Sequence, residues 1–137
     1  LMGMYTSAAQ YSEQYYHRAL KVRSMIRSDF DRIFDPDGLY RLDALLTPTT
    51  PTTAFHINEL YGDSVLMQYA DQLTVPANHA GIPGISIPAG FDAQGLPIGI
   101  QFLCNDFRED LMFRAAHAYE RATLDADWRK LQPQVLR

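Results

Sequence analysis

Two short alternating segments with turn-forming residues between them constrain the fold of this chain most strongly. Residues Ile85–Ile87 and Ile98–Phe102 place apolar side chains at every second position, which is typical of strands with one covered face. The stretch Asp92–Gly95 lies between them and supplies residues that favour a tight turn. The pattern therefore predicts a β-hairpin in the second half of the chain.

Two other segments carry helical periodicity. The spacing over residues 8–34 predicts one long amphipathic helix that ends at the breaker cluster Asp35–Gly38. Its apolar stripe comprises Tyr15, Ala19, Val22, Ile26, Phe30 and Ile33. A last helix is predicted over residues 107–122, with Asp106 and Glu109 as a capping pair. Its buried stripe comprises Leu111, Ala115, Ala118 and Ala122.

The region between the long helix and the hairpin contains one more strand and one more helical segment. Residues 43–47 are apolar and predict a buried strand, whereas residues 48–63 have no period and predict a surface loop. A helical pattern then runs from about residue 63 to Gly81, with Pro76 inside it. Because proline removes an intrahelical hydrogen bond, this segment is either one kinked helix or two short helices, the second beginning at Pro76.

The predicted order is helix, strand, helix, hairpin, helix, which indicates the α/β class. Three strands are too few to cover three helices, so we expect the strand at 43–47 and the hairpin to join a larger sheet. The chain begins at Leu1 without an initiator methionine. We interpret residues 1–137 as a fragment of a single domain.

Composition and charge argue against several classes of function. The net charge of −4 and the pI near 5.4 do not provide the basic surface that binds a nucleic-acid backbone, and the basic residues of 18–32 alternate with acids as on a solvated helix face. Cys104 is the only cysteine, which fits a reducing compartment such as the cytoplasm. No run of 18 apolar residues is present, so we expect no membrane span. No metal site is predicted from the spacing of the four histidines, His17, His56, His79 and His117.

A polar row near Pro76 is the strongest candidate for binding chemistry. Asp71, Thr74 and Asn78 are spaced i, i+3, i+7, so on one helix they share a face. The carboxylate of Asp71 is suited to hold an ammonium or an amide donor through a charge-assisted hydrogen bond. A solvent-facing stripe or a helix-capping network explains the same spacing, and we expect Thr74 and Asn78 to serve as helix-bend and backbone partners.

No residue has the local sequence context of a nucleophile. Ser86 lies in a strand without a G-x-S-x-G turn, and Cys104 lies at a strand end with no histidine near it in sequence. We therefore expect Ser86 to occupy one face of the hairpin and Cys104 to be a partly buried small residue.

Three ordered motifs resemble the C-terminal third of the amidase-signature family. They are Leu45–Thr49 (LLTPT), Thr74–Pro88 (TVPANHAGIPGISIP) and Gly95–Phe102 (GLPIGIQF). Residues Tyr15–Phe30 and Ala115–Glu120 resemble the helices that precede and follow these motifs in the family. Within the family, the motifs are similar to those of the A subunits of tRNA-dependent amidotransferases.

The resemblance implies an α/β fold with a mixed central sheet flanked by helices, of which residues 1–137 form the C-terminal part. It also implies amide hydrolysis by a serine nucleophile, assisted by a second serine and a lysine, without a cofactor or a metal. These three residues belong to the N-terminal and middle portions of the family. No catalytic residue is therefore assigned to this chain.

The resemblance implies one substrate-binding residue. In the amidotransferases of this family, an aspartate three residues before Thr-x-Pro contacts the α-amino group of glutamine, and the matching position here is Asp71. The arginine that binds the substrate carboxylate is expected just before Leu1. The implied partners are the N-terminal part of the same enzyme, a small amide such as glutamine, and other amidotransferase subunits. No direct contact with nucleic acid or with a membrane is implied.

Two other interpretations stay open. The chain belongs to a stand-alone amidase for another small amide, or it acts alone as a non-catalytic module that binds a partner. The carboxylate of Asp71 favours an amino-acid amide, because a purely apolar amide makes no use of it. The module predicts a soluble, cooperatively folding chain without exposed apolar surface.

Overall fold

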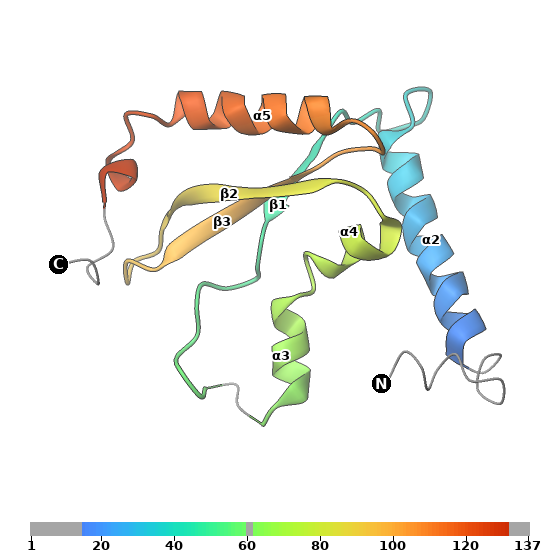
Figure 1. Cartoon of the computed structure of the whole chain (residues 1–137), viewed down its shortest axis with the longest axis horizontal. Coiled ribbons are helices and arrows are strands. Elements are labelled where there is room, and N and C mark those ends of the chain that lie inside the picture. Colours follow the sequence, from blue (N-terminus) through green and yellow to red (C-terminus); the bar gives the residue numbers. More distant parts are fainter. Residues whose placement is uncertain (1–14, 60–61, 132–137) are drawn as a thin grey trace.

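The computed structural model describes residues 15–59 and 62–131. A three-stranded sheet lies at the centre of Figure 1, with α5 on one side of it, α3 and α4 on the other, and α2 at one end. The elements are α2 (His17–Phe34), β1 (Leu45–Pro48), α3 (Ser64–Ala70), α4 (Val75–Ala80), β2 (Gly84–Phe91), β3 (Pro97–Leu103), α5 (Glu109–Ala122) and the short 3₁₀ helix η2 (Asp127–Lys130). The α/β class and the predicted order are confirmed, with the second helical segment divided in two.

Strands β2 and β3 form the predicted hairpin. They pair antiparallel, with Ile85 opposite Phe102. Asp92 organises the connecting turn, because its Oδ1 accepts hydrogen bonds from the backbone N–H groups of Gln94 and Leu96 at 2.9 and 2.8 Å. Both strands extend beyond the alternating segments that predict them.

Strand β3 is central in the sheet, and both β1 and β2 pair antiparallel to it. The described strands therefore form a purely antiparallel sheet, and the expected mixed sheet is not formed among them. The predicted strand is confirmed, but it begins at Leu45 rather than at residue 43. Its predicted burial is wrong, because β1 lies at an edge of the described sheet and Leu46 is 52% exposed. The described residues of the predicted loop, 49–59 and 62–63, contain no helix or strand.

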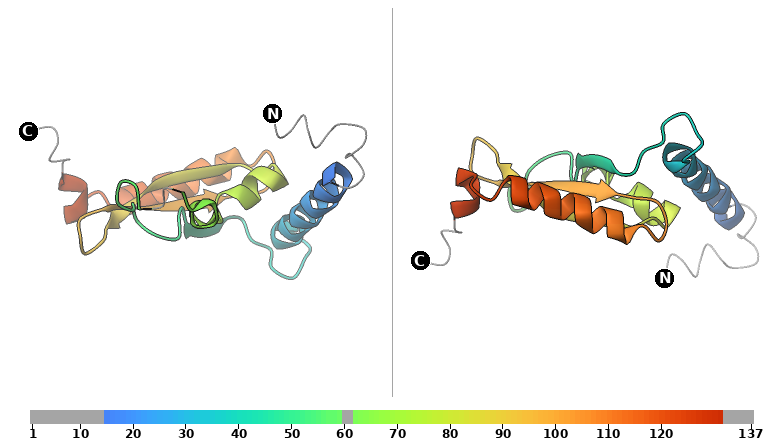
Figure 2. Two further views of the ribbon diagram at one scale, coloured as in Figure 1. Left: turned by 90° about the horizontal axis from the view of Figure 1, so that it is seen from below. Right: turned by 90° about the horizontal axis from the view of Figure 1, so that it is seen from above.

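Two hydrophobic clusters cover opposite faces of the sheet, because neighbouring residues of a strand point to opposite sides. The cluster beneath α5 contains Phe102, Cys104, Met112 and Ala116. The cluster against α2 and α4 contains Phe34, Ala77, Ala80, Ile82 and Leu103. The two views in Figure 2 show α5 and α4 on different sides of the strands. The sheet thus separates the two clusters.

The long N-terminal helix is confirmed from His17 to Phe34, and residues 8–14 of the predicted helix lie outside the described residues. Only the C-terminal half of the predicted apolar stripe packs. Ile26 and Phe30 contact the core, whereas Val22 is 55% exposed. The N-terminal half of α2 therefore presents apolar side chains at the surface. None of the helices within the described ranges is both long and apolar enough to cross a membrane.

The capping pair predicted for α5 is wrong. The helix begins at Glu109, and its N-cap residue is Arg108, without a side-chain cap. The physical reason is that the carboxylate of Asp106 binds the guanidinium of Arg27 instead. The buried stripe is also shifted, since the helix buries Met112 and Ala116, partly packs Leu111, Ala115 and Tyr119, and exposes Ala118 and Ala122.

Candidate functional site

The chain turns sharply between α3 and α4, over residues 71–74, which we call the α3–α4 turn. Asp71 is the C-cap residue of α3, and its carbonyl oxygen accepts hydrogen bonds from the backbone N–H groups of Thr74 and Val75, both at 3.0 Å. Pro76 lies in the first turn of α4, where its missing N–H removes no helical hydrogen bond. The interpretation as two short helices is confirmed, although the second begins at Val75 rather than at Pro76. Gly81 then ends α4 in the left-handed conformation, with φ of 76°.

The predicted polar row is not formed. Its three residues are divided between a turn and a helix, so helical spacing does not place them on one face. The Thr74 hydroxyl donates back to the carbonyl oxygen of Asp71 at 3.2 Å, which confirms Thr74 as a backbone partner. Asn78 is exposed on α4 and makes no such contact with any described residue. Asp71 alone is left as a candidate for ligand binding.

Asp71 lines a concave surface of about 350 Å³ between α2 and the two short helices. The other lining residues are Ile26, Gln68, Gln72, Val75, Pro76 and His79. The exposed carboxylate makes no hydrogen bond or ion pair with the residues that the structure describes. It lies beside two carboxamides, so this surface offers acceptors for a cation together with donors for a carboxylate or an amide.

A second concave surface of about 390 Å³ lies between α3 and the loop that precedes it. It is lined by Pro51, Thr52, Thr53, Ala54, Phe55, Glu59, Leu66, Tyr69 and Ala70. Its carboxylate, that of Glu59, already accepts a hydrogen bond from the backbone N–H of His56 at 2.7 Å. Of these two concave surfaces, the one beside the α3–α4 turn therefore contains the carboxylate that accepts no hydrogen bond from the described residues.

Gln101 on β3 joins the α3–α4 turn to the sheet. The residue is buried, and its amide nitrogen donates to the hydroxyl of Thr47 at 2.9 Å and to the carbonyl oxygen of Leu73 at 2.8 Å. Sequence reasoning missed this role. The alternation in 98–102 predicts that Gln101 lies on the other face of the strand from its apolar neighbours. It does not predict which residues cover that face.

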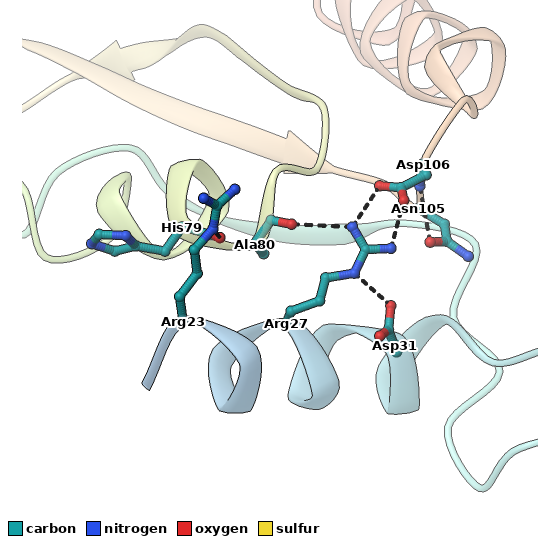
Figure 3. Close-up of polar contacts among 7 residues, drawn as sticks. All are labelled: Arg23, Arg27, Asp31, His79, Ala80, Asn105 and Asp106. Atoms are coloured by element: carbon teal, nitrogen blue, oxygen red, sulfur yellow. Dashed lines mark hydrogen bonds and ion pairs between the residues drawn. The ribbon is translucent and has the colours of Figure 1, made fainter. Parts of the chain in front are cut away.

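Two arginines of α2 hold the C-terminal end of α4, as Figure 3 shows. Nε of Arg23 donates to the carbonyl oxygen of His79 at 2.8 Å, and Nη1 of Arg27 donates to that of Ala80 at 3.1 Å. Arg27 also binds both carboxylate oxygens of Asp106, and this hydrogen bonding is the main cause that raises the pKa of the guanidinium. Both arginines satisfy carbonyl groups left free at a helix end. Arg23 is exposed, as expected for a solvated face, whereas the side chain of Arg27 is only 32% exposed and departs from that expectation.

Among the described residues, no nucleophile is paired with a base. Ser86 is exposed, and its hydroxyl lies 2.7 Å from that of Thr49. Cys104 is fully buried rather than partly buried, and burial raises the pKa of its thiol. His117 is exposed on α5, 3.5 Å from Glu120. Nucleophilic catalysis needs a base within hydrogen-bond reach, and none of these three side chains has such a partner arrangement in the described part of the chain.

Comparison with known sequences decides the family. The sequence profile described as Amidase matches residues 1–113. The chain belongs to the amidase family. The A subunit of glutamyl-tRNA(Gln) amidotransferase from Microcystis aeruginosa is 50% identical to this amidase chain over 133 residues, which are 97% of the chain and 26% of the relative. The corresponding protein from Prochlorococcus marinus is 51% identical over 120 residues, which are 88% of the chain and 24% of the relative.

Two solved structures resemble this amidase chain. The A subunit of glutamyl-tRNA(Gln) amidotransferase from Thermotoga maritima has a TM-score of 0.65 and 40% identity, over 82% of this chain and 24% of that one. The 6-aminohexanoate cyclic dimer hydrolase has a TM-score of 0.71 and 26% identity, over 95% of this chain and 27% of that one. The predicted family is thus confirmed, and the chain spans about a quarter of the length of the curated relatives that it matches.

Proposed function

We propose that residues 1–137 form the C-terminal, substrate-pocket-forming part of a single amidase domain. The proposed reaction is hydrolysis of the side-chain amide of glutamine, which breaks the C–N bond and releases ammonia for the amidation of Glu-tRNA(Gln). The two serines and the lysine that perform this chemistry in the family lie outside this chain, and no cofactor is required. Family membership supports the reaction, and the identity to amidotransferase A subunits supports the substrate.

Asp71 is the proposed substrate-binding residue. The observation that carries the proposal is its carboxylate, which lies without a protein partner among the described residues in the concave surface beside the α3–α4 turn. An ionised carboxylate forms a charge-assisted hydrogen bond with the α-ammonium group of an amino acid. Glutamine carries that group next to its amide chain, whereas a simple amide does not. Asp71 therefore contributes to the choice of substrate, and not to the cleavage step.

The N-terminal part of the same enzyme is the proposed partner that covers the exposed apolar surface of this chain. Large apolar residues are exposed on the two helices beside the concave surface, namely Val22 and Met25 on α2 and Val65 and Tyr69 on α3. Apolar surface of this kind marks a site of interaction. Other amidotransferase subunits are further proposed partners, and the cytoplasm is the proposed compartment.

The test compares glutamine with glutaramate, the same amide without the α-amino group, in the full-length enzyme that contains this segment. Asp71→Asn keeps the size of the side chain and removes its charge. We expect kcat/KM for glutamine to fall about tenfold or more, because one partner of a charge pair is lost. We expect kcat/KM for glutaramate to change less than about twofold.

Asp127→Asn is the matched control for this test. Asp127 is exposed in η2 and pairs with Lys130 at 2.9 Å, away from the concave surface. This variant should behave as the wild-type enzyme with both substrates. If Asp71→Asn hydrolyses glutamine with an unchanged kcat/KM, the role of Asp71 is refuted.

A stand-alone amidase for another small amide is the second candidate. It is favoured by the likeness to 6-aminohexanoate cyclic dimer hydrolase, which covers 95% of this chain. The wild-type enzyme separates the two candidates in the same assay. A higher kcat/KM for glutaramate than for glutamine supports the second candidate, and the reverse order supports the first.

A further inference from the structure

Gln101 is the one polar residue that is buried among the described residues, with 5% of its surface exposed. A carboxamide buried without hydrogen-bond partners is strongly destabilising, so its surroundings must provide acceptors. They do so from two directions. The hydroxyl of Thr47 belongs to β1, and the carbonyl oxygen of Leu73 belongs to the α3–α4 turn. A longer contact of 3.4 Å reaches the carbonyl oxygen of Pro48.

The bond to Leu73 has a defined direction. A carbonyl oxygen only accepts hydrogen bonds, so the NH₂ end of the Gln101 side chain must face the turn. Among the described residues, this is the hydrogen bond through which a side chain of the sheet holds the backbone of the α3–α4 turn. Leu73 lies two positions after Asp71, inside a turn that is closed by the carbonyl oxygen of Asp71. The bond therefore fixes the turn that presents the Asp71 carboxylate.

No described side chain or backbone group fixes the carboxylate of Asp71 directly. It makes no hydrogen bond or ion pair with the described residues, so its position depends on the backbone that carries it. A charge-assisted hydrogen bond weakens steeply when distance or angle departs from its optimum. Because Asp71 has no side-chain partner, the position of its carboxylate is determined by the conformation of the α3–α4 turn.

We propose that Gln101 is a positioning residue that holds Asp71 in place to bind the ammonium group of the substrate. The inference rests on the function proposed above and goes beyond it, because it assigns to a buried strand residue the control of substrate choice. Gln101 touches neither the substrate nor the reacting atoms. It acts through Leu73 and the α3–α4 turn.

The experiment measures a discrimination ratio, defined as kcat/KM for glutamine divided by kcat/KM for glutaramate, in the full-length enzyme. Gln101→Met keeps the length of the side chain and removes the donor to Leu73. We expect the ratio to fall about threefold to tenfold, through a higher KM for glutamine at a similar kcat. Gln94→Met makes the same chemical change at an exposed position of the β2–β3 turn and should leave the ratio unchanged.

Two outcomes with folded Gln101→Met enzyme overturn the inference. One is a wild-type ratio. The other is an equal loss with both substrates, which is what a purely structural role predicts. If Gln101→Met does not fold, Gln101→Asn takes its place, because it keeps an amide in the interior but is one methylene too short to reach Leu73. The same fall in the ratio is then expected, and an unchanged ratio refutes the inference.

The double variant separates this inference from the proposed function. If Gln101 acts through Asp71, then Gln101→Met lowers the ratio no further in an Asp71→Asn background. An Asp71→Asn enzyme with the wild-type ratio refutes the proposed substrate-binding role of Asp71, on which this inference rests. An Asp71→Asn enzyme with a reduced ratio, together with a Gln101→Met enzyme at the wild-type ratio, refutes the role of Gln101 alone.

Discussion

At the residue scale, Arg27 joins three parts of the chain at one planar cation. Its guanidinium binds both oxygens of Asp106 and the carbonyl oxygen of Ala80, and its Nε donates to Asp31 at 2.8 Å. The side chains of Arg27 and Asp106 are 32% and 33% exposed, so solvent screens this pair less than a fully exposed one. Helices α2 and α4 and the connection from β3 to α5 therefore meet at one side chain. A lysine offers one point charge and does not reproduce the forked geometry.

We predict that Arg27→Lys destabilises the enzyme by about 1 kcal/mol, because the lysine side chain loses hydrogen bonds to a charged partner and to a helix end. Arg32→Lys is the matched control, since Arg32 lies 3.7 Å from Asp29 in a pair that is 71% and 73% exposed. The control should change stability by less than about 0.5 kcal/mol. The measurement is the melting midpoint of the full-length enzyme. Equal midpoints for the two variants contradict the role given to Arg27.

At the scale of the elements, local patterns predict some features of this fold and leave others open. The hairpin is predictable because alternation and the residues around Asp92 act within a few positions of each other. The division of the second helical segment is not, because Pro76 is compatible with both a kink and a helix start. The contact of Arg27 with Asp106 joins residues 79 positions apart. No periodic pattern carries information about such a partner, and the same applies to Gln101 and Leu73.

The turn between β2 and β3 is predicted to weaken in acid. The carboxylate of Asp92 accepts hydrogen bonds from the Thr53 hydroxyl and from the backbone N–H groups of Leu96 and Gln94, and these bonds, the one from Thr53 foremost, lower its pKa. A carboxyl group with a lowered folded-state pKa stabilises the fold above its unfolded pKa, and this stabilisation is lost as pH falls through the folded value. We expect the protection of these two amides against hydrogen exchange, relative to intrinsic rates, to fall below about pH 4.

Two variants check the origin of that acid sensitivity. Asp92→Asn removes the titrating group, so the protection of the Gln94 and Leu96 amides should no longer depend on pH in this range. Thr53→Val removes the hydrogen bond that lowers the pKa of the carboxyl group most, so the loss of protection should be smaller and complete at a higher pH. A wild-type turn with constant protection between pH 5 and about pH 3 is incompatible with this account.

At the scale of the whole molecule, the surface beside the candidate site exposes large apolar side chains. Met25 on α2 is 68% exposed and Val65 on α3 is 59% exposed, and both helices border the concave surface that contains Asp71. Strands β1 and β2 form the two edges of the sheet in the described residues. Exposed apolar surface and unpaired strand edges both favour association with another polypeptide. The apolar surface is contrary to what the non-catalytic module predicts.

The last prediction follows from this surface. When produced alone, residues 1–137 should self-associate, and co-production with the N-terminal part of an amidotransferase A subunit should give a soluble one-to-one complex. Size-exclusion chromatography and native mass measurement distinguish these states. Val22→Glu together with Met25→Glu places charge on the exposed face of α2, so it should reduce the self-association and also weaken the complex. A monodisperse monomer that unfolds cooperatively without a partner supports the module instead, because such a chain needs no second polypeptide to cover its apolar side chains.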